Sequence, residues 1–211
     1  MIPSICKHRV MSRENFLAIQ KKVWENGATL YLSIDFGFIA EFESLTGFRV
    51  QDSEKISENG TVTLNGEQIP FHRNRRMYLE SVGADILACD NLGIPAIAVN
   101  DYGNGKVVYV NFPLETMLLE RNDVTDGNYY KIYKTVFDDL INSHPVRTPN
   151  PYVGITLHER ADGSHYAVAI NYSVDAQKPD FIFGSGKQMG KIFHGSTERI
   201  PGYDAVIFEV L

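Results

Sequence analysis

The sequence predicts an α/β fold, in which a mixed sheet is flanked by helices, followed by a small all-β domain. Three observations predict it. Helical and strand-like patterns alternate as far as Gly47, and three apolar runs with very short connections lie between 85 and 112. Beyond a proline-rich segment, the chain holds only short β-branched and aromatic runs.

The first predicted helix begins after Ser12 and ends at Gly27. Ser12 can cap free N–H groups, Gly27 can stop the helix, and apolar residues at helical spacing form a stripe between them. The run 28–34, ATLYLSI, is typical of a buried strand. A turn at 35–37, DFG, then leads into a helical run, FIAEFESLTG, that ends at Gly47.

A hairpin and three further strands follow. Asn65-Gly66 lies between two short extended runs and suits the positive dihedrals of a type I′ turn. The apolar runs 85–90, 94–100 and 106–112 are joined so closely that they must be antiparallel to one another, which makes the sheet mixed. The segment 101–106, DYGNGK, lacks the phosphate-loop patterns and precedes a strand, so we interpret it as a hairpin turn.

The remaining chain is divided by prolines. A helix over 127–143, with one apolar face to cover the sheet, completes a first domain predicted at 1–145. The segment 144–151, HPVRTPNP, is interpreted as a linker. Residues 152–211 form the second predicted domain, a small all-β module.

Composition and charge exclude several classes of function. The formal charge of -6 argues against nucleic-acid binding, which needs a basic face. The chain has no apolar run near the roughly 20 residues of a membrane helix and no signal-peptide layout, so we expect a cytoplasmic location and no membrane partner. Cys6 and Cys89 have neither CxxC spacing nor paired histidines, which favours reduced, partly buried thiols, no zinc site and no cofactor.

The candidates for catalysis are few. A nucleophile elbow needs Ser or Cys on a sharp strand-to-helix turn, but the one such turn carries Asp35 at its tip and leaves Ser33 inside the strand. We interpret this turn as structural. The alternative is a stand-alone hydrolase in which Ser33 or Asp35 works with His72. No carboxylate pair is placed for glycosidase chemistry among Glu41, Glu43, Glu80 and Glu115.

The histidines are scattered without metal-ligand spacing, and each is interpreted as a surface or turn residue: His8, His72, His144, His158, His165 and His194. The single basic cluster is FHRNRR, residues 71–76. Its members His72, Arg73, Arg75 and Arg76 are the candidate contact for an anion or a partner surface, and the alternative is a solvated or salt-bridged loop.

Four segments together resemble a known group of proteins: GATLYLS (27–33), LTGFRV (45–50), GADILACDNLGIPAIAVNDYGNGKVVYVNFPLE (83–115) and HERADGSHYAVAINYS (158–173). They are similar to the C-terminal half of multidomain bacterial glycoside hydrolases, above all to β-galactosidases with a trimerisation domain after their (β/α)8 barrel, and to mannanase- or cellulase-like enzymes. The resemblance implies a flavodoxin-like, degenerate class I glutamine amidotransferase-like fold for 1–145 and a β-sandwich for 152–211.

The resemblance implies that the chain keeps the fold of an amidotransferase without its catalytic residues. Class I amidotransferases use a cysteine at the elbow and a histidine near the end of a later strand. Here the matching strand ends in Phe112-Pro113-Leu114-Glu115, and neither Cys6 nor Cys89 lies at an elbow. No catalytic residue is therefore assigned.

The leading hypothesis is a non-catalytic accessory region of a glycoside hydrolase. The abrupt start at MIPSICKH is expected of a fragment, and the barrel that carries the catalytic glutamates is missing from the chain. The α/β domain would mediate subunit contacts in a homo-oligomer, and the β module would pack against the barrel. A further alternative is carbohydrate binding by the β module. Its only candidate platforms are tyrosines, because Trp24 lies in the first helix: Tyr152, Tyr166, Tyr172 and Tyr203.

Overall fold

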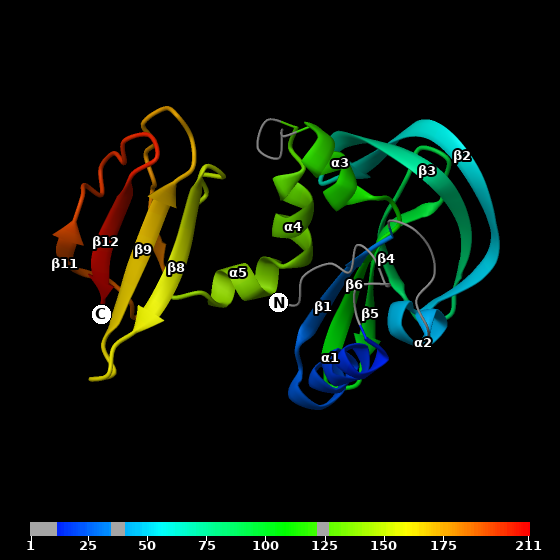
Figure 1. Ribbon diagram of the computed structural model, residues 1–211, viewed down its shortest axis with the longest axis horizontal. Helices are drawn as coiled ribbons and strands as arrows, with labels where there is room; N and C mark the ends of the chain where they lie inside the picture. Colours follow the sequence, from blue (N-terminus) through cyan, green and yellow to red (C-terminus); the bar gives the residue numbers. More distant parts are fainter. Residues whose placement is uncertain (1–11, 35–40, 122–126) are drawn as a thin grey trace. The chain divides into compact units, whose positions relative to one another are not determined.

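The computed structural model describes residues 12–34, 41–121 and 127–211 of the chain (Figure 1). The fold is mixed α/β, as the sequence predicts. It is rich in strands, which form several separate sheets. The chain divides into two compact units, Met1–Asn128 and Tyr129–Leu211. Each unit has a hydrophobic core of its own.

The first unit contains a mixed sheet, a long two-stranded ribbon and three helices within its described residues. Its elements in chain order are α1 (Arg13–Asn26), β1 (Thr29–Ser33), α2 (Phe42–Thr46), β2 (Phe48–Leu64), β3 (Glu67–Ser81), β4 (Asp85–Cys89), β5 (Pro95–Tyr102), β6 (Gly105–Val110) and α3 (Leu114–Arg121).

The sheet has the strand order β1-β6-β5-β4. β1 runs parallel to β6, whereas β5 is antiparallel to both β6 and β4. The predicted mixed sheet is therefore confirmed. The parallel neighbours are separated by a long stretch of sequence, as a parallel pair requires.

The ends of α1 are those that the sequence predicts. The Ser12 side chain accepts a hydrogen bond from the backbone N–H of Asn15, and Gly27 ends the helix with φ 71°. The predicted apolar stripe is only partly correct, because its residues form two rows on the helix. Val23 belongs to the row packed on the sheet, whereas Trp24 belongs to the other row and is 54% exposed.

The segment DYGNGK is a hairpin turn, as predicted, and its glycines allow close contact with α1. A Cβ at Gly105 would lie 2.2 Å from the backbone oxygen of Ala28, and one at Gly103 would lie 2.6 Å from that of Trp24. Between the glycines, the backbone N–H of Asn104 donates to the Trp24 oxygen over 2.8 Å. The turn therefore satisfies a carbonyl that the helix end leaves free.

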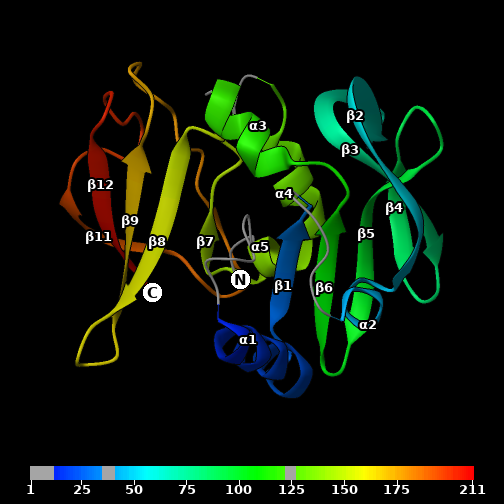
Figure 2. The same ribbon diagram turned by 45° about the vertical axis from the view of Figure 1, so that its right-hand side comes forward.

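The ribbon of β2 and β3 is much longer than the sequence indicates. The Asn65-Gly66 turn is confirmed, since both residues have positive φ, 52° and 83°. The strands that it joins have 17 and 15 residues, where the sequence predicts two short runs. Charged residues within both strands hide the alternating pattern. Figure 2 shows the ribbon curving past β4, and a bridge between Val62 and Asp90 joins them.

The second unit begins with α4 (Tyr130–Val136) and α5 (Asp138–Ser143). The sequence predicts one helix over 127–143, which is wrong, because the chain leaves the helical conformation at Phe137 with φ -115° and ψ 18°. Asp138 and Asp139 lie in the first turn of α5, where carboxylates favour the start of a new helix.

The strands of the second unit form two antiparallel sheets. They are β7 (Val146–Arg147), β8 (Val153–Glu159), β9 (His165–Asn171), β10 (Ile182–Phe183), β11 (Met189–His194) and β12 (Ala205–Val210). The larger sheet has the order β11-β12-β9-β8, and β7 pairs with β10. Val146 of the expected linker is buried in the core. The domain bounds 1–145 and 152–211 stay a prediction.

The close contact between the 103–105 turn and α1 can be tested by substitution. We expect Gly105→Ala to lower the free energy of unfolding by roughly 1–3 kcal/mol, because its Cβ would press on backbone atoms that cannot move aside. Gly83→Ala is the control, since a Cβ there first meets the Asn100 side chain at 3.4 Å. Urea unfolding measures both variants, and equal losses would contradict the close contact as the cause.

Candidate functional site

The carboxyl ends of β1 and β6 form the first candidate site, since ligands of α/β sheets bind at this edge. Ser33 is the last residue of β1, pairs with Val110 and is 6% exposed. Its position inside the strand is the predicted one. Glu115 lies in the first turn of α3, and the Ser33 hydroxyl donates a hydrogen bond to its carboxylate Oε2. Residues 35–37, the tip of the predicted turn, lie outside the described residues.

The contact between Ser33 and Glu115 joins residues that sequence reasoning treats separately. They are 82 positions apart in the chain. The contact could have been predicted only from the parallel pairing of β1 with β6. Segments that follow two adjacent parallel strands leave the sheet at the same edge. No motif marks either residue.

A serine and a glutamate are two members of a serine hydrolase triad, which also needs a histidine. In the serine hydrolase triad, a histidine takes the serine proton and passes it to the leaving group. His72 makes its hydrogen bonds to the Asn59 side chain over 3.0 Å and to the Ser57 hydroxyl over 3.4 Å, both on β2. Neither of these contacts of His72 reaches Ser33 or Glu115. The predicted pairing of Ser33 with His72 is therefore not formed.

A buried polar cluster lies at the carboxyl end of β6, next to this edge. The Tyr109 hydroxyl donates to Asn111 Oδ1 over 3.2 Å, and the Asn111 amide donates to the Pro95 oxygen over 3.0 Å. Burial raises the pKa of Tyr109 well above its ordinary value, so this phenol stays neutral. The cluster consists of satisfied structural hydrogen bonds.

The basic cluster at 71–76 does not act as a unit. Arg73 is buried, and its Nη1 lies 2.7 Å from Oδ2 of Asp90, which is buried as well. Its Nε donates to Glu58 Oε1 over 2.6 Å, while its Nη2 lies 2.5 Å from the same oxygen without hydrogen-bond geometry. Asp90 uses its other oxygen to accept the backbone N–H groups of Leu92 and Ile94. Arg73 therefore fixes the ribbon to the end of β4.

Arg76 completes a second set of ion pairs on the ribbon. It donates to both carboxylate oxygens of Glu58 and contacts Glu54 Oε1 over 2.5 Å. Tyr78 bridges the same groups, since its hydroxyl lies 3.1 Å from Arg76 and 3.0 Å from Glu54. The hydrogen bonds from Arg76, and then those from Arg73, lower the pKa of Glu58. Glu58 raises the pKa of Arg76 in turn.

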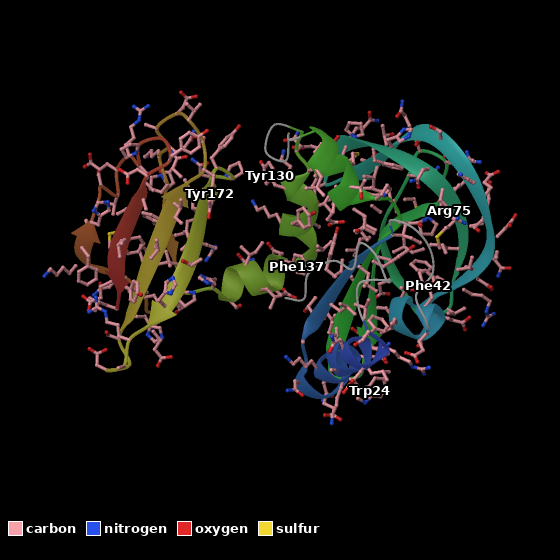
Figure 3. All side chains as sticks on the ribbon, viewed as in Figure 1. Trp24, Phe42, Arg75, Tyr130, Phe137 and Tyr172 are labelled. Atoms are coloured by element: carbon pink, nitrogen blue, oxygen red, sulfur yellow. The ribbon has the colours of Figure 1, made fainter. Side chains whose placement is uncertain are left out.

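Arg75 and His72 face other neighbours. Arg75, labelled on the ribbon in Figure 3, donates to the Ser53 hydroxyl over 3.2 Å. His72 is exposed on the outer side of β3. An anion or partner contact through His72, Arg73, Arg75 and Arg76 stays a prediction, and carboxylates of the chain already engage Arg73 and Arg76.

A polar groove of about 780 Å³ lies beside α2 in the first unit. Its lining comes from α2 and its flanking residues, from the start of β2, from the connection between β3 and β4, and from the end of β5: Glu41, Phe42, Glu43, Ser44, Gly47, Arg49, Val82, Gly83, Asn100 and Asp101. Arg49 binds Glu43 through two 3.0 Å hydrogen bonds, which lower the pKa of Glu43. The Asn100 amide donates to the Leu45 oxygen over 2.9 Å and secures the end of α2.

The four candidate tyrosines of the second unit differ in exposure. Tyr172 is 63% exposed and Tyr203 is 75% exposed. Tyr152 and Tyr166 are partly buried. The Tyr166 ring is stacked on His158, with centroids 5.0 Å apart, and Arg160 lies over it at 5.4 Å. Only Tyr172 and Tyr203 therefore present largely free rings.

Two smaller expectations concern cysteine and metal chemistry. Cys89 is exposed, so its predicted partial burial is wrong, because edge strand β4 points this side chain outward. Cys6 and His8 lie outside the described residues.

In the described part of the chain, no group of three His, Cys, Asp or Glu side chains is arranged to hold a metal ion. No helix described here is long and apolar enough to cross a membrane.

No protein-family model and no curated protein matches this sequence. Solved structures do match. One is a catalytic mutant of a GH42 β-galactosidase from G. stearothermophilus, with a TM-score of 0.59 and 15% identity over 94% of this chain and 30% of that chain. The β-galactosidase from Bacillus circulans sp. alkalophilus gives a TM-score of 0.57 and 15% identity over the same shares.

A third match is α-L-fucosidase isoenzyme 2 from Paenibacillus thiaminolyticus, with a TM-score of 0.60 and 10% identity over 100% of this chain and 40% of that chain. This chain thus spans 30 to 40% of the length of these proteins. Such identities show a shared fold. The expected similarity in fold to parts of glycoside hydrolases is confirmed, and the amidotransferase-like class of the first domain stays a prediction.

The buried ion pair between Arg73 and Asp90 can be tested by a double-mutant cycle. Asp90→Asn keeps the Oδ1 acceptor but removes the charge that faces Arg73, and Arg73→Met leaves Asp90 buried without its cation. We expect each to cost about 3 kcal/mol or more of unfolding free energy. The double variant should cost at least about 1 kcal/mol less than the sum of the two.

The control for this cycle is Arg49→Met, which breaks an exposed ion pair with Glu43. We expect a loss below about 1 kcal/mol. Chemical denaturation measures all four variants. Additive losses in the Arg73 and Asp90 cycle would show that the two side chains do not stabilise each other.

Proposed function

We propose that this chain is a non-catalytic accessory and oligomerisation region of a glycoside hydrolase of the β-galactosidase, mannanase or cellulase kind. In this proposal, residues 1–145 are a degenerate amidotransferase-like domain that resembles the trimerisation domain of β-galactosidases. Residues 152–211 are a β-sandwich that packs on the catalytic (β/α)8 barrel. The chain matches only 30 to 40% of the length of its glycoside hydrolase neighbours, as an accessory region of a longer enzyme would, and this supports the proposal.

The observation that carries the proposal is the contact between Ser33 and Glu115. At the edge where an active relative needs a nucleophile and a base, the serine hydroxyl is bound by the carboxylate of Glu115 in α3. The matching strand continues as Phe112-Pro113-Leu114, and Phe112 is buried with its ring stacked on Phe71 at 4.5 Å. In this proposal, a buried phenylalanine therefore occupies the position at which an active relative would carry its catalytic histidine.

Exposed apolar side chains on β4 support a subunit contact. β4 is the edge strand of the mixed sheet. Ile86 is 44% exposed and Leu87 is 46% exposed, and Val82 and Leu92 beside the strand are 43% and 55% exposed. Apolar residues grouped at a sheet edge favour association with another chain.

A second candidate function is a stand-alone acyl hydrolase, and the same Ser33 contact favours it. In that mechanism the Ser33 oxygen attacks an ester or amide carbonyl, its proton passes to Glu115, and Glu115 gives the proton to the departing alcohol or amine. A water molecule then cleaves the acyl-serine ester, with Glu115 taking the water proton and returning it to the Ser33 oxygen. The burial of Ser33 weighs against it.

The first test is an assay of the chain on aryl β-galactosides, β-mannosides and β-glucosides, on aryl esters and on glutamine. We expect no turnover above that of the Ser33→Ala variant, because Ser33 is buried at the end of β1 and its hydroxyl is bound to Glu115. A barrel-containing β-galactosidase is the positive control. Turnover or fluorophosphonate labelling that Ser33→Ala abolishes would replace the accessory role with the acyl hydrolase.

The second test concerns self-association. We expect sedimentation equilibrium to show an oligomer, and Leu87→Lys to weaken its association at least about tenfold, because a charge would have to be buried at the β4 edge. Leu17→Lys is the matched control, since Leu17 is 43% exposed on α1 in the same unit. A monomeric chain, or equal effects of the two variants, would contradict β4 as the contact surface.

A further inference from the structure

Tyr203 has a backbone conformation that its side chain disfavours. Its φ is 56°, in the left-handed region that glycine, asparagine and aspartate adopt most readily. Its ring is 75% exposed, so burial within the chain gives little compensation for this strain. Among the described residues, no hydrogen bond engages its hydroxyl. The fold alone therefore gives no reason for a tyrosine at this position.

Tyr172 lies on a neighbouring loop and rests on a glycine. A Cβ at Gly154 would lie 2.6 Å from Cε2 of the Tyr172 ring and 3.4 Å from its Cζ, so only glycine lets the ring lie this close to β8. The ring is nevertheless 63% exposed. Its position at the end of β9 is marked in Figure 3. One side of the ring is thus supported by the strand while the other is open to solvent.

A buried asparagine holds the two loops together. Asn171 is fully buried, and its amide donates to the backbone oxygens of Asp175, Ile200 and Pro201 over 2.8–3.1 Å. Its Oδ1 accepts the backbone N–H and the hydroxyl of Ser173. One side chain therefore fixes both the loop after β9 and the loop before β12.

The loops also touch directly. The backbone N–H of Tyr203 donates to the Ser173 oxygen over 3.1 Å. A Cβ at Gly202 would lie 2.0 Å from the Val174 oxygen, so the backbones meet where only glycine fits. Both rings are consequently carried by a rigid, hydrogen-bonded base, which lowers the entropy that a ligand must overcome on binding.

We infer that Tyr172 and Tyr203 form a carbohydrate-binding platform on the second unit. The apolar C–H face of a pyranose packs on an open aromatic ring, and the phenol hydroxyl can hydrogen-bond to a sugar hydroxyl. Asp204, which follows Tyr203 in the chain, is exposed and adds a polar group that suits hydroxyl-rich ligands better than an apolar protein surface. A platform open on one side fits an oligosaccharide chain. This binding role goes beyond the accessory role proposed above and does not depend on it.

The test is a ¹H–¹⁵N NMR titration of the full chain with cellohexaose, mannohexaose and β-1,4-galactohexaose. We expect saturable shifts at 172–174 and 202–204 with at least one of the three. Tyr172→Ala should weaken that binding roughly five- to tenfold. Tyr166→Ala is the matched control and should leave it unchanged, because His158 and Arg160 cover the faces of that ring.

Tyr203→Asn separates binding from folding. Asparagine tolerates the left-handed backbone, so this variant should keep or raise the midpoint of thermal unfolding while the affinity for the hexaose falls several-fold. Three results would overturn the platform. They are no saturable shift up to about 10 mM hexaose, shifts confined to other residues, and a Tyr172→Ala variant that alters self-association while sugar binding is absent.

Discussion

The architecture of the first unit depends on the parallel pairing of β1 with β6. β6 is the strand that joins β1 to the antiparallel part of the sheet. At one end of the pair, the turn of Gly103 to Gly105 presses on the end of α1, and at the other end Ser33 meets Glu115. Both contacts require the register that places Ser33 opposite Val110. A shift of one residue would turn Ser33 to the other face of the sheet and lose its bond to Glu115.

The same pairing decides what the carboxyl edge of the sheet can do. An enzyme keeps a nucleophile there accessible and places a base beside it that can relay a proton. Here Ser33 is buried, Glu115 of α3 supplies a carboxylate that binds it, and Phe112, which follows β6, is buried and stacked on Phe71. These contacts are those expected of a structural edge, which is the basis of the non-catalytic role proposed above.

The sequence predicts elements that local chemistry determines and misses those that distant contacts determine. Ser12, Gly27 and Asn65-Gly66 act within a few residues, so their caps and turn could be predicted. The length of the β2–β3 ribbon could not, because Arg73 lies at an inward position where an alternating pattern calls for an apolar residue. Its burial depends on Asp90, which is 17 positions away and belongs to another element. The Ser33 contact is hidden for the same reason.

Arg73 and Tyr203 both conflict with their local surroundings, and the fold resolves only the first of these conflicts. A buried arginine within a strand is costly, but Asp90 and Glu58 neutralise Arg73 and fix the ribbon in the process. A left-handed backbone at an exposed tyrosine is also costly, yet nothing in the described residues covers the Tyr203 ring or binds its hydroxyl. The loop contacts explain the backbone conformation but not the tyrosine side chain, and this is the basis of the carbohydrate platform inferred above. The Tyr172 ring, held open on Gly154 by the same pair of loops, indicates where that partner binds.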